Sequence, residues 1–111
     1  MMRKEVNNMF LEKYLNATYL DLIYSNYNEE YLNTLEEDNF LKIYNLFKSY
    51  SFYFIDDIIL KYLEIFDMDY NDVLNGIINL KNKLGDNFIY IIGNDMTYLE
   101  EIFNEEETEI V

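Results

Sequence analysis

The chain of 111 residues has no proline and only three glycines, and this feature limits its possible folds more than any other. Linkers and many-stranded sheets usually need both residues for their turns. Apolar residues instead recur at steps of three and four, the spacing of one face of an α-helix. A chain of this length has room for one core. The sequence therefore predicts an all-α single domain, a compact bundle of about five to six short helices in residues 1–104, followed by an acidic, frayed tail in residues 105–111.

Capping residues mark the expected helix ends. Asn28, Asp38, Asp69 and Asp95 are of types that favour the N-cap, and each precedes a stretch with helical periodicity. Gly85 stands where a left-handed residue would end the helix that Asp69 begins. These signals predict four helices.

Two more helices are predicted from periodicity alone. Residues 6–24 form an amphipathic pattern, which either continues throughout or breaks near Asn16. The clearest stripe in the sequence consists of apolar residues at helical spacing, namely Ile55, Ile58, Ile59, Tyr62, Ile65 and Phe66. We expect this second stripe to form one continuous central helix.

Three segments allow two interpretations. Residues 49–55 have the composition of a buried strand, but they lack a partner strand and are interpreted as a junction between helices. Asn75-Gly76 is a strong hairpin signal within a longer helical pattern, and we favour the helix. Gly76 would then mark a close crossing of helices. The apolar residues of 86–92, closed by Gly93, fit either a two-turn helix or a strand.

The chain lacks the residue types that most catalytic sites use. Without cysteine or histidine it has no disulfides, no thiolate nucleophile, no sulfur ligand for zinc, and neither the commonest general base nor the commonest metal ligand. We therefore expect a protein that is not an enzyme and needs no cofactor or metal.

The acidic motifs also favour structural interpretations. Residues 67–72 resemble the start of a calcium-binding loop, but the sixth position is Asp72 instead of glycine and the twelfth is Ile78 instead of glutamate. Helix capping explains these acids better. Adjacent acids, such as Asp56-Asp57, point about 100° apart on a helix, so we interpret them as solvated surface.

The charge balance points to a partner. The chain has 22 acidic and 8 basic residues, a net charge of −14, and eight acidic residues but no basic one follow Lys83. Such a surface repels nucleic acid and acidic lipids and speeds encounter with a basic protein. No apolar run is long enough to span a bilayer, and the first residues do not resemble a signal peptide, so we expect a cytoplasmic protein.

The predicted partner-binding residues lie in the one-signed C-terminal part, and they are Asp95, Tyr98, Glu100, Glu101, Glu105 and Glu106. Six tyrosines lie near acids in the sequence, and we expect some of them to be exposed: Tyr19, Tyr24, Tyr27, Tyr31, Tyr90 and Tyr98. The alternative places these rings at the edge of the core with their hydroxyls in water.

These features favour a non-enzymatic acidic protein that captures or occludes a basic, nucleic-acid-binding protein. A phage-encoded inhibitor of a defence nuclease (anti-CRISPR-like or a nucleic-acid mimic), an antitoxin and an immunity protein are examples of this class. The alternative is a structural adaptor that forms a homo-oligomer or larger assembly through aromatic helix faces.

Overall fold

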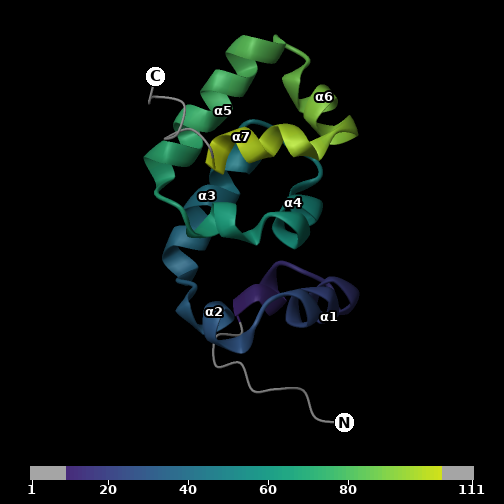
Figure 1. Ribbon diagram of the computed structural model, residues 1–111, viewed down its shortest axis with the longest axis vertical. Coiled ribbons are helices and arrows are strands. Elements are labelled where there is room, and N and C mark those ends of the chain that lie inside the picture. Colours follow the sequence, from purple (N-terminus) through teal and green to yellow (C-terminus); the bar gives the residue numbers. More distant parts are fainter. Residues whose placement is uncertain (1–9, 104–111) are drawn as a thin grey trace.

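Helices account for most of residues 10–103, the part of the chain that the computed structural model describes (Figure 1). No strand occurs within these residues. The elements in chain order are η1 (Phe10–Lys13), α1 (Ala17–Asn26), α2 (Glu29–Thr34), α3 (Glu37–Ser49), α4 (Ile55–Lys61), η2 (Leu63–Asp67), α5 (Tyr70–Leu84), α6 (Phe88–Asn94), η3 (Met96–Leu99) and α7 (Glu100–Phe103), where η denotes a 3-10 helix. The prediction of an all-α bundle of short helices is confirmed. The tail at 105–111 lies outside the described residues.

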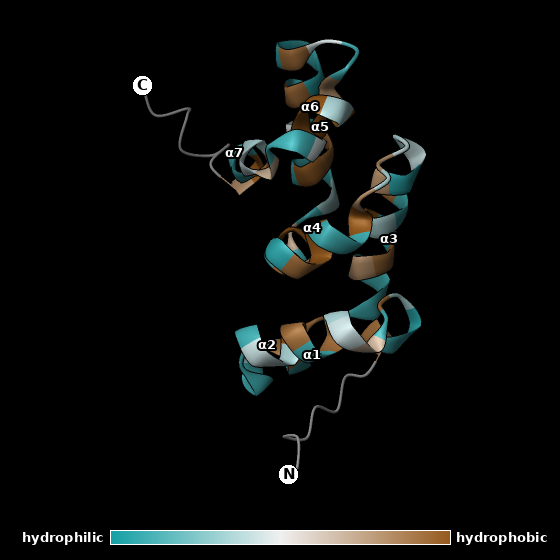
Figure 2. Cartoon of the chain, turned by 90° about the vertical axis from the view of Figure 1, so that its right-hand side faces the viewer, coloured by the Kyte–Doolittle hydropathy of each residue, from teal (hydrophilic) through white to brown (hydrophobic). Residues whose placement is uncertain are grey.

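The helices stack in successive layers along the long axis of Figure 1. α1 and α2 form the lower layer, α4 and η2 lie in the middle, and α5, α6 and α7 form the upper layer. α3 connects the lower layer to the others and packs against η2, α4 and α5. Figure 2 shows hydrophobic and hydrophilic residues alternating around the helices, as amphipathic elements require.

A continuous chain of phenylalanine rings links these layers. Phe40 packs on Phe10 below and on Phe66 above, with ring centroids 5.3 and 5.0 Å apart. Phe47 continues the chain, 5.5 Å from Phe66 and 5.0 Å from Phe52, and Phe52 lies 6.0 Å from Phe88 of α6 in the upper layer. Each aromatic pair contributes about 0.5–1.5 kcal/mol beyond the area it buries. The core therefore extends through all the layers as one unit.

Side-chain capping marks the start of four helical elements. Asn16, Asn28, Asp69 and Asp95 each accept a hydrogen bond from a backbone N–H two or three residues ahead. The predicted break near Asn16 is thus confirmed, since Asn16 starts α1.

The predicted cap at Asp38 is wrong. α3 begins earlier, at Glu37, and its N-cap is Glu36, whose side chain makes no capping hydrogen bond. The buried Leu35 ends α2, and the Phe40 N–H already reaches the Glu36 carbonyl at 3.0 Å. Asp38 consequently lies within the first turn of α3.

The continuous central helix is also wrong. α4 stops at Lys61, Tyr62 adopts φ −135° and ψ 52°, and η2 follows. Leu63, Ile65 and Phe66 are all almost fully buried. These three residues span too wide an arc to share one face of a continuous α-helix, and the break at Tyr62 directs all of them inward.

The ambiguous segments are resolved as helices and a junction. Residues 75 and 76 lie inside α5, which ends at Gly85 with φ +88° as predicted. α6 continues through Gly93, so this glycine does not close the segment; a Cβ there would lie 2.8 Å from the Tyr53 hydroxyl. Residues 50–54 turn between α3 and α4, with Ser51 at φ +69°.

Candidate functional site

The carboxylates of this protein lie at its surface. No Asp or Glu side chain of residues 10–103 is buried. Within the same range two ion pairs neutralise carboxylates, Lys13 with Glu37 at 2.9 Å and Lys83 with Glu101 at 2.7 Å. The described surface therefore carries a large excess of negative charge.

Three tyrosine hydroxyls hold carboxylates of other elements in place. Tyr19 of α1 donates to Asp57 of α4 at 2.6 Å, Tyr27 reaches Glu64 of η2 at 3.4 Å, and Tyr62 donates to Glu100 of α7 at 3.1 Å. A neutral hydroxyl orients a carboxylate without cancelling its charge. These contacts therefore fix negative charge in place, whereas lysine partners would neutralise it.

The tyrosines respond to this environment. The Asp57 hydrogen bond raises the pKa of Tyr19 above its usual 10.0. Burial and then the nearby Glu64 carboxylate raise the pKa of Tyr27. Burial and then the Glu100 carboxylate raise the pKa of Tyr62. Each hydroxyl stays protonated and remains a donor.

Two of these tyrosines, Tyr27 and Tyr62, belong to the best candidate site. We call it the Tyr62 surface, and it consists of Tyr27, Tyr62, Glu64, Asp95 and Glu100. A shallow depression of about 640 Å³ is lined by Tyr27, Tyr62 and Glu64 together with Asn26, Leu60 and Lys61. Asp95 is near enough to add to the rise in the pKa of Tyr62. The half-exposed Phe103 ring lies 6.1 Å from the Tyr62 ring. Acids and aromatic rings thus share one surface.

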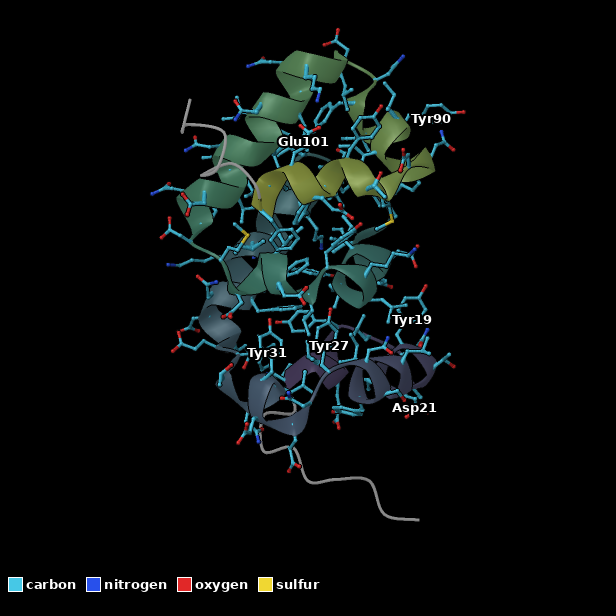
Figure 3. The ribbon with its side chains drawn as sticks, viewed as in Figure 1. Tyr19, Asp21, Tyr27, Tyr31, Tyr90 and Glu101 are labelled. Atoms are coloured by element: carbon cyan, nitrogen blue, oxygen red, sulfur yellow. The ribbon has the colours of Figure 1, made fainter. Side chains whose placement is uncertain are left out.

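The structure places four of the six predicted partner-binding residues. Asp95 caps η3, and Glu100 accepts from Tyr62. Glu101 is exposed (Figure 3) and paired with Lys83. Tyr98 is half-buried against the core. Asp95 and Glu100 therefore approach the same tyrosine, whereas Glu101 is partly neutralised. Glu105 and Glu106 lie outside the described residues.

Most of the predicted tyrosines lie at the edge of the core. Tyr19, Tyr27 and Tyr31 occupy the space between α1–α2 and the elements above (Figure 3), and with Tyr24 and Tyr98 they are half-buried. Tyr90 alone of the six is largely exposed, at 66%. Five of the six rings therefore lie at the edge of the core, as the alternative interpretation expected, but the hydroxyls of Tyr19 and Tyr27 contact carboxylates and the Tyr31 hydroxyl is buried.

Sequence reasoning missed Tyr53, Asp57, Tyr62 and Glu64. Tyr53 is 71% exposed, although its apolar neighbourhood suggested a buried junction. Asp57 looked like one half of a solvated acid pair, and Tyr62 was assigned to a helix interior. The wide spread of apolar residues over 58–66 was the one sequence signal of the break at Tyr62.

Metal binding finds no support in the described range. No group of three or more acidic side chains there is arranged to hold an ion. Asp69, from the calcium-like stretch, accepts from the Asn71 N–H at 3.0 Å and caps α5, as expected.

None of the helices in residues 10–103 has the length and apolar character needed to cross a membrane. Comparison with protein-family models, curated proteins and solved structures gives no match for this chain.

Proposed function

We propose that this protein is a non-enzymatic acidic binding protein that captures a basic protein. The Tyr62 surface is the proposed centre of the contact, and we propose that the predicted Tyr98, Glu101, Glu105 and Glu106 also contribute to binding. The observation that carries the proposal is the hydrogen bonding of tyrosines to Glu64 and Glu100, because it holds two charged carboxylates in place without neutralising them.

Such an arrangement suits capture of a basic surface. A carboxylate held in position loses less side-chain entropy when a partner binds. The uncompensated field of the whole surface speeds encounter with a positively charged protein. The rings of Tyr27, Tyr62 and Phe103 supply the aromatic contacts that are common among interface residues with large energetic effects.

The class of partner follows from the sign of the charge. A net charge of −14 opposes direct binding of nucleic acid. The same negative charge is complementary to the basic surface with which a nucleic-acid-binding enzyme contacts phosphates. Spaced carboxylates would then imitate part of the row of phosphates along a nucleic-acid backbone. An inhibitor of a nuclease, an antitoxin and an immunity protein all fit this behaviour. The absence of cysteine and histidine supports a role without catalysis.

The exposed rings favour one alternative. Tyr53 and Tyr90 are both largely exposed aromatic residues, and such rings also occur in contacts between copies of a protein. On this alternative the protein is a structural adaptor or oligomer, and acidity maintains its solubility.

A capture experiment at two ionic strengths separates these functions. The tagged full chain is incubated with lysate of the cells that naturally produce it, and the retained proteins are identified. We expect basic proteins at low salt and a steep loss of them at high salt. Added duplex DNA should compete for the same proteins. Retention of acidic proteins, or retention that ignores salt, contradicts capture by charge, and a salt-resistant homo-oligomer in sedimentation supports the adaptor.

A further inference from the structure

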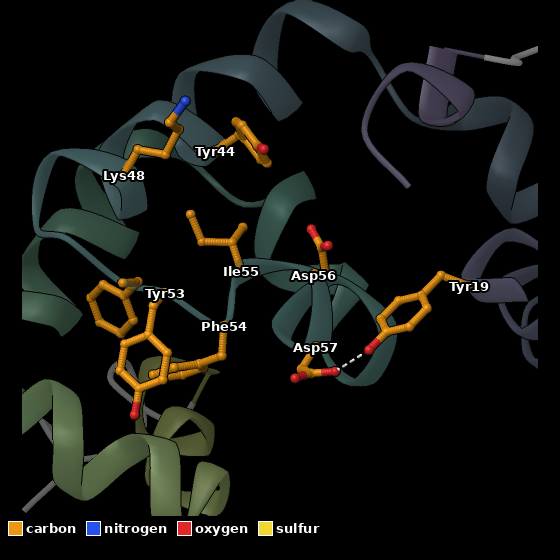
Figure 4. Close-up of a pocket in the computed structure, with 9 residues that line it drawn as sticks. Tyr19, Tyr44, Lys48, Tyr53, Phe54, Ile55, Asp56 and Asp57 are labelled. Carbon is orange, nitrogen blue, oxygen red and sulfur yellow. Dashed lines mark hydrogen bonds between the residues drawn. The ribbon is translucent and has the colours of Figure 1, made fainter. Parts of the chain in front are cut away.

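A second depression lies between α1, the end of α3 and the start of α4 (Figure 4). Its volume is about 320 Å³. Three tyrosines, Tyr19, Tyr44 and Tyr53, contribute to its walls, together with the carboxylates of Asp56 and Asp57. We call it the α1–α4 groove. It is distinct from the Tyr62 surface, since no residue lines both depressions.

Tyr53 is an exposed ring held in a defined place. Its ring packs edge-to-face against Phe54, with centroids 4.9 Å apart. Its hydroxyl lies against α6 at Gly93, where a Cβ would come within 2.8 Å. Despite these contacts 71% of the residue stays exposed. A fixed and exposed aromatic ring is available to a partner without loss of side-chain freedom.

The groove already contacts one cation. The Lys48 ammonium lies 5.7 Å from the centroid of the Tyr44 ring, which is within the range of a cation–π contact. Lys48 forms no ion pair with Asp56 or Asp57 among the described residues. The Tyr44 ring therefore contacts a positive charge, and the negative charges of Asp56 and Asp57 are not neutralised by Lys48.

The two carboxylates have little compensation. Partial burial, followed by the neighbouring Asp57 carboxylate, raises the pKa of Asp56 above its usual value. Asp57 accepts from the neutral Tyr19 hydroxyl. A cation entering the groove would relieve the repulsion between the two acids.

We propose that the α1–α4 groove binds an arginine side chain from a basic segment of a protein partner. The occupant follows from charge complementarity, because the Asp56 and Asp57 carboxylates and the exposed Tyr53 ring all line the groove. Arginine suits it better than lysine, since a planar guanidinium can stack on a tyrosine ring and donate two parallel hydrogen bonds to a single carboxylate. The inference rests on the proposed capture of a basic protein and gives that partner a second point of contact.

The test uses single amino-acid probes, which do not depend on the identity of the partner. The ¹⁵N-labelled full chain is titrated with N-acetyl-arginine amide, the corresponding lysine amide and the uncharged citrulline amide. We expect amide shifts at residues 53–57 that saturate at lower concentration for arginine than for lysine, with no saturation for citrulline. Tyr53→Ala should weaken arginine binding roughly two- to fivefold, as an exposed cation–π contact implies. Asp56→Asn with Asp57→Asn should weaken it about tenfold, as loss of a charged hydrogen bond implies.

Matched controls separate this site from the general field. Asp72→Asn with Asp86→Asn removes the same charge far along the chain and should leave the arginine titration unchanged. Equal, diffuse shifts for arginine and lysine that are unaffected by the groove variants overturn the groove proposal but leave salt-dependent capture of a basic protein intact. Sedimentation of a dimer that Tyr53→Ala abolishes also overturns it, because a second copy then covers the groove. Failure of the lysate capture alone, with specific arginine binding retained, overturns the proposed function instead.

Discussion

Ile102 of α7 packs directly over Gly76 of α5. A Cβ on residue 76 would lie 2.7 Å from Cγ1 of Ile102 and 3.3 Å from its Cβ. Both residues are buried, and this crossing positions the short helix that carries Glu100 and Glu101. The acidic surface thus depends on a glycine in the middle of a helix.

Gly76→Ala should destabilise the protein by about 1–2 kcal/mol, because overpacking near the Ile102 backbone exceeds the helix-propensity gain of alanine. Urea unfolding at neutral pH measures the effect. The exposed Asn75→Ala, one residue away on the same helix, should be neutral or stabilising. In a double-mutant cycle, Ile102→Ala should cost less in the Gly76→Ala background than in the wild type. Equal or greater stability of Gly76→Ala would contradict a close crossing.

Glu36→Asn should stabilise the protein by about 0.5–1 kcal/mol, because asparagine caps a helix well and Glu36 does not. The backbone at residue 36 already has the extended conformation of an N-cap, with φ −111° and ψ 127°. Thermal unfolding measures the change. Glu36→Gln is the matched control. It removes the same charge, which helps to raise the pKa of Asp67, but its side chain is too long to cap. An equal gain in both variants would assign the effect to charge.

These helix ends show how far the sequence determines the fold. α5 was predicted at both ends, because Asp69 and Gly85 act on their own neighbouring backbone. The start of α3 was missed because it depends on the burial of Leu35, which is a tertiary effect. The N-cap is therefore Glu36, two residues before Asp38, whose side chain is the better cap. The break at Tyr62 was missed for the same reason, since a continuous helix satisfies the local pattern equally well.

The site was less predictable than the fold. The excess of acids near the C-terminus is visible in the sequence, and Asp95 and Glu100 do lie around one tyrosine. Their shared partner, Tyr62, stands more than thirty residues earlier in the chain. Pairing of a tyrosine with an acid depends on how helices cross, and charge and periodicity do not encode that crossing.

Mild acid should stabilise this protein through Asp56. Burial and Asp57 raise its pKa above 3.8 in the folded chain, so the folded state binds a proton more readily than the unfolded state. Its contribution is present at low pH and lost as pH rises through the folded pKa. Asp56→Asn should therefore increase stability at neutral pH and weaken the gain on acidification. Asp72→Asn, with the same change of charge, should leave that gain in place.

Alkaline pH should destabilise the protein through its tyrosines. The pKa is raised by the Asp57 hydrogen bond at Tyr19 and by burial at Tyr27, Tyr31, Tyr44 and Tyr62. The unfolded chain therefore loses these protons first, and stability falls as pH rises above the ordinary value of 10.0. Urea unfolding at about pH 8 and about pH 11 measures the fall. Tyr62→Phe should reduce it, whereas the exposed Tyr90→Phe should not.

Glu64→Gln combined with Glu100→Gln should weaken capture of the basic partner without unfolding the protein. Glutamine keeps a carbonyl acceptor for the Tyr27 and Tyr62 hydroxyls, so the change removes charge and little else. Two partly exposed charges imply roughly a tenfold loss of affinity at low salt, and the salt dependence should become shallower.

Asp72→Asn combined with Asp86→Asn lowers the net charge equally at a distance from the Tyr62 surface. If this control weakens capture as much as the Glu64–Glu100 variant, the partner senses only total charge. The two variants differ in the position of the lost charges and not in net charge. If only the Glu64–Glu100 variant loses affinity, the contact therefore lies at the carboxylates that tyrosines hold in place.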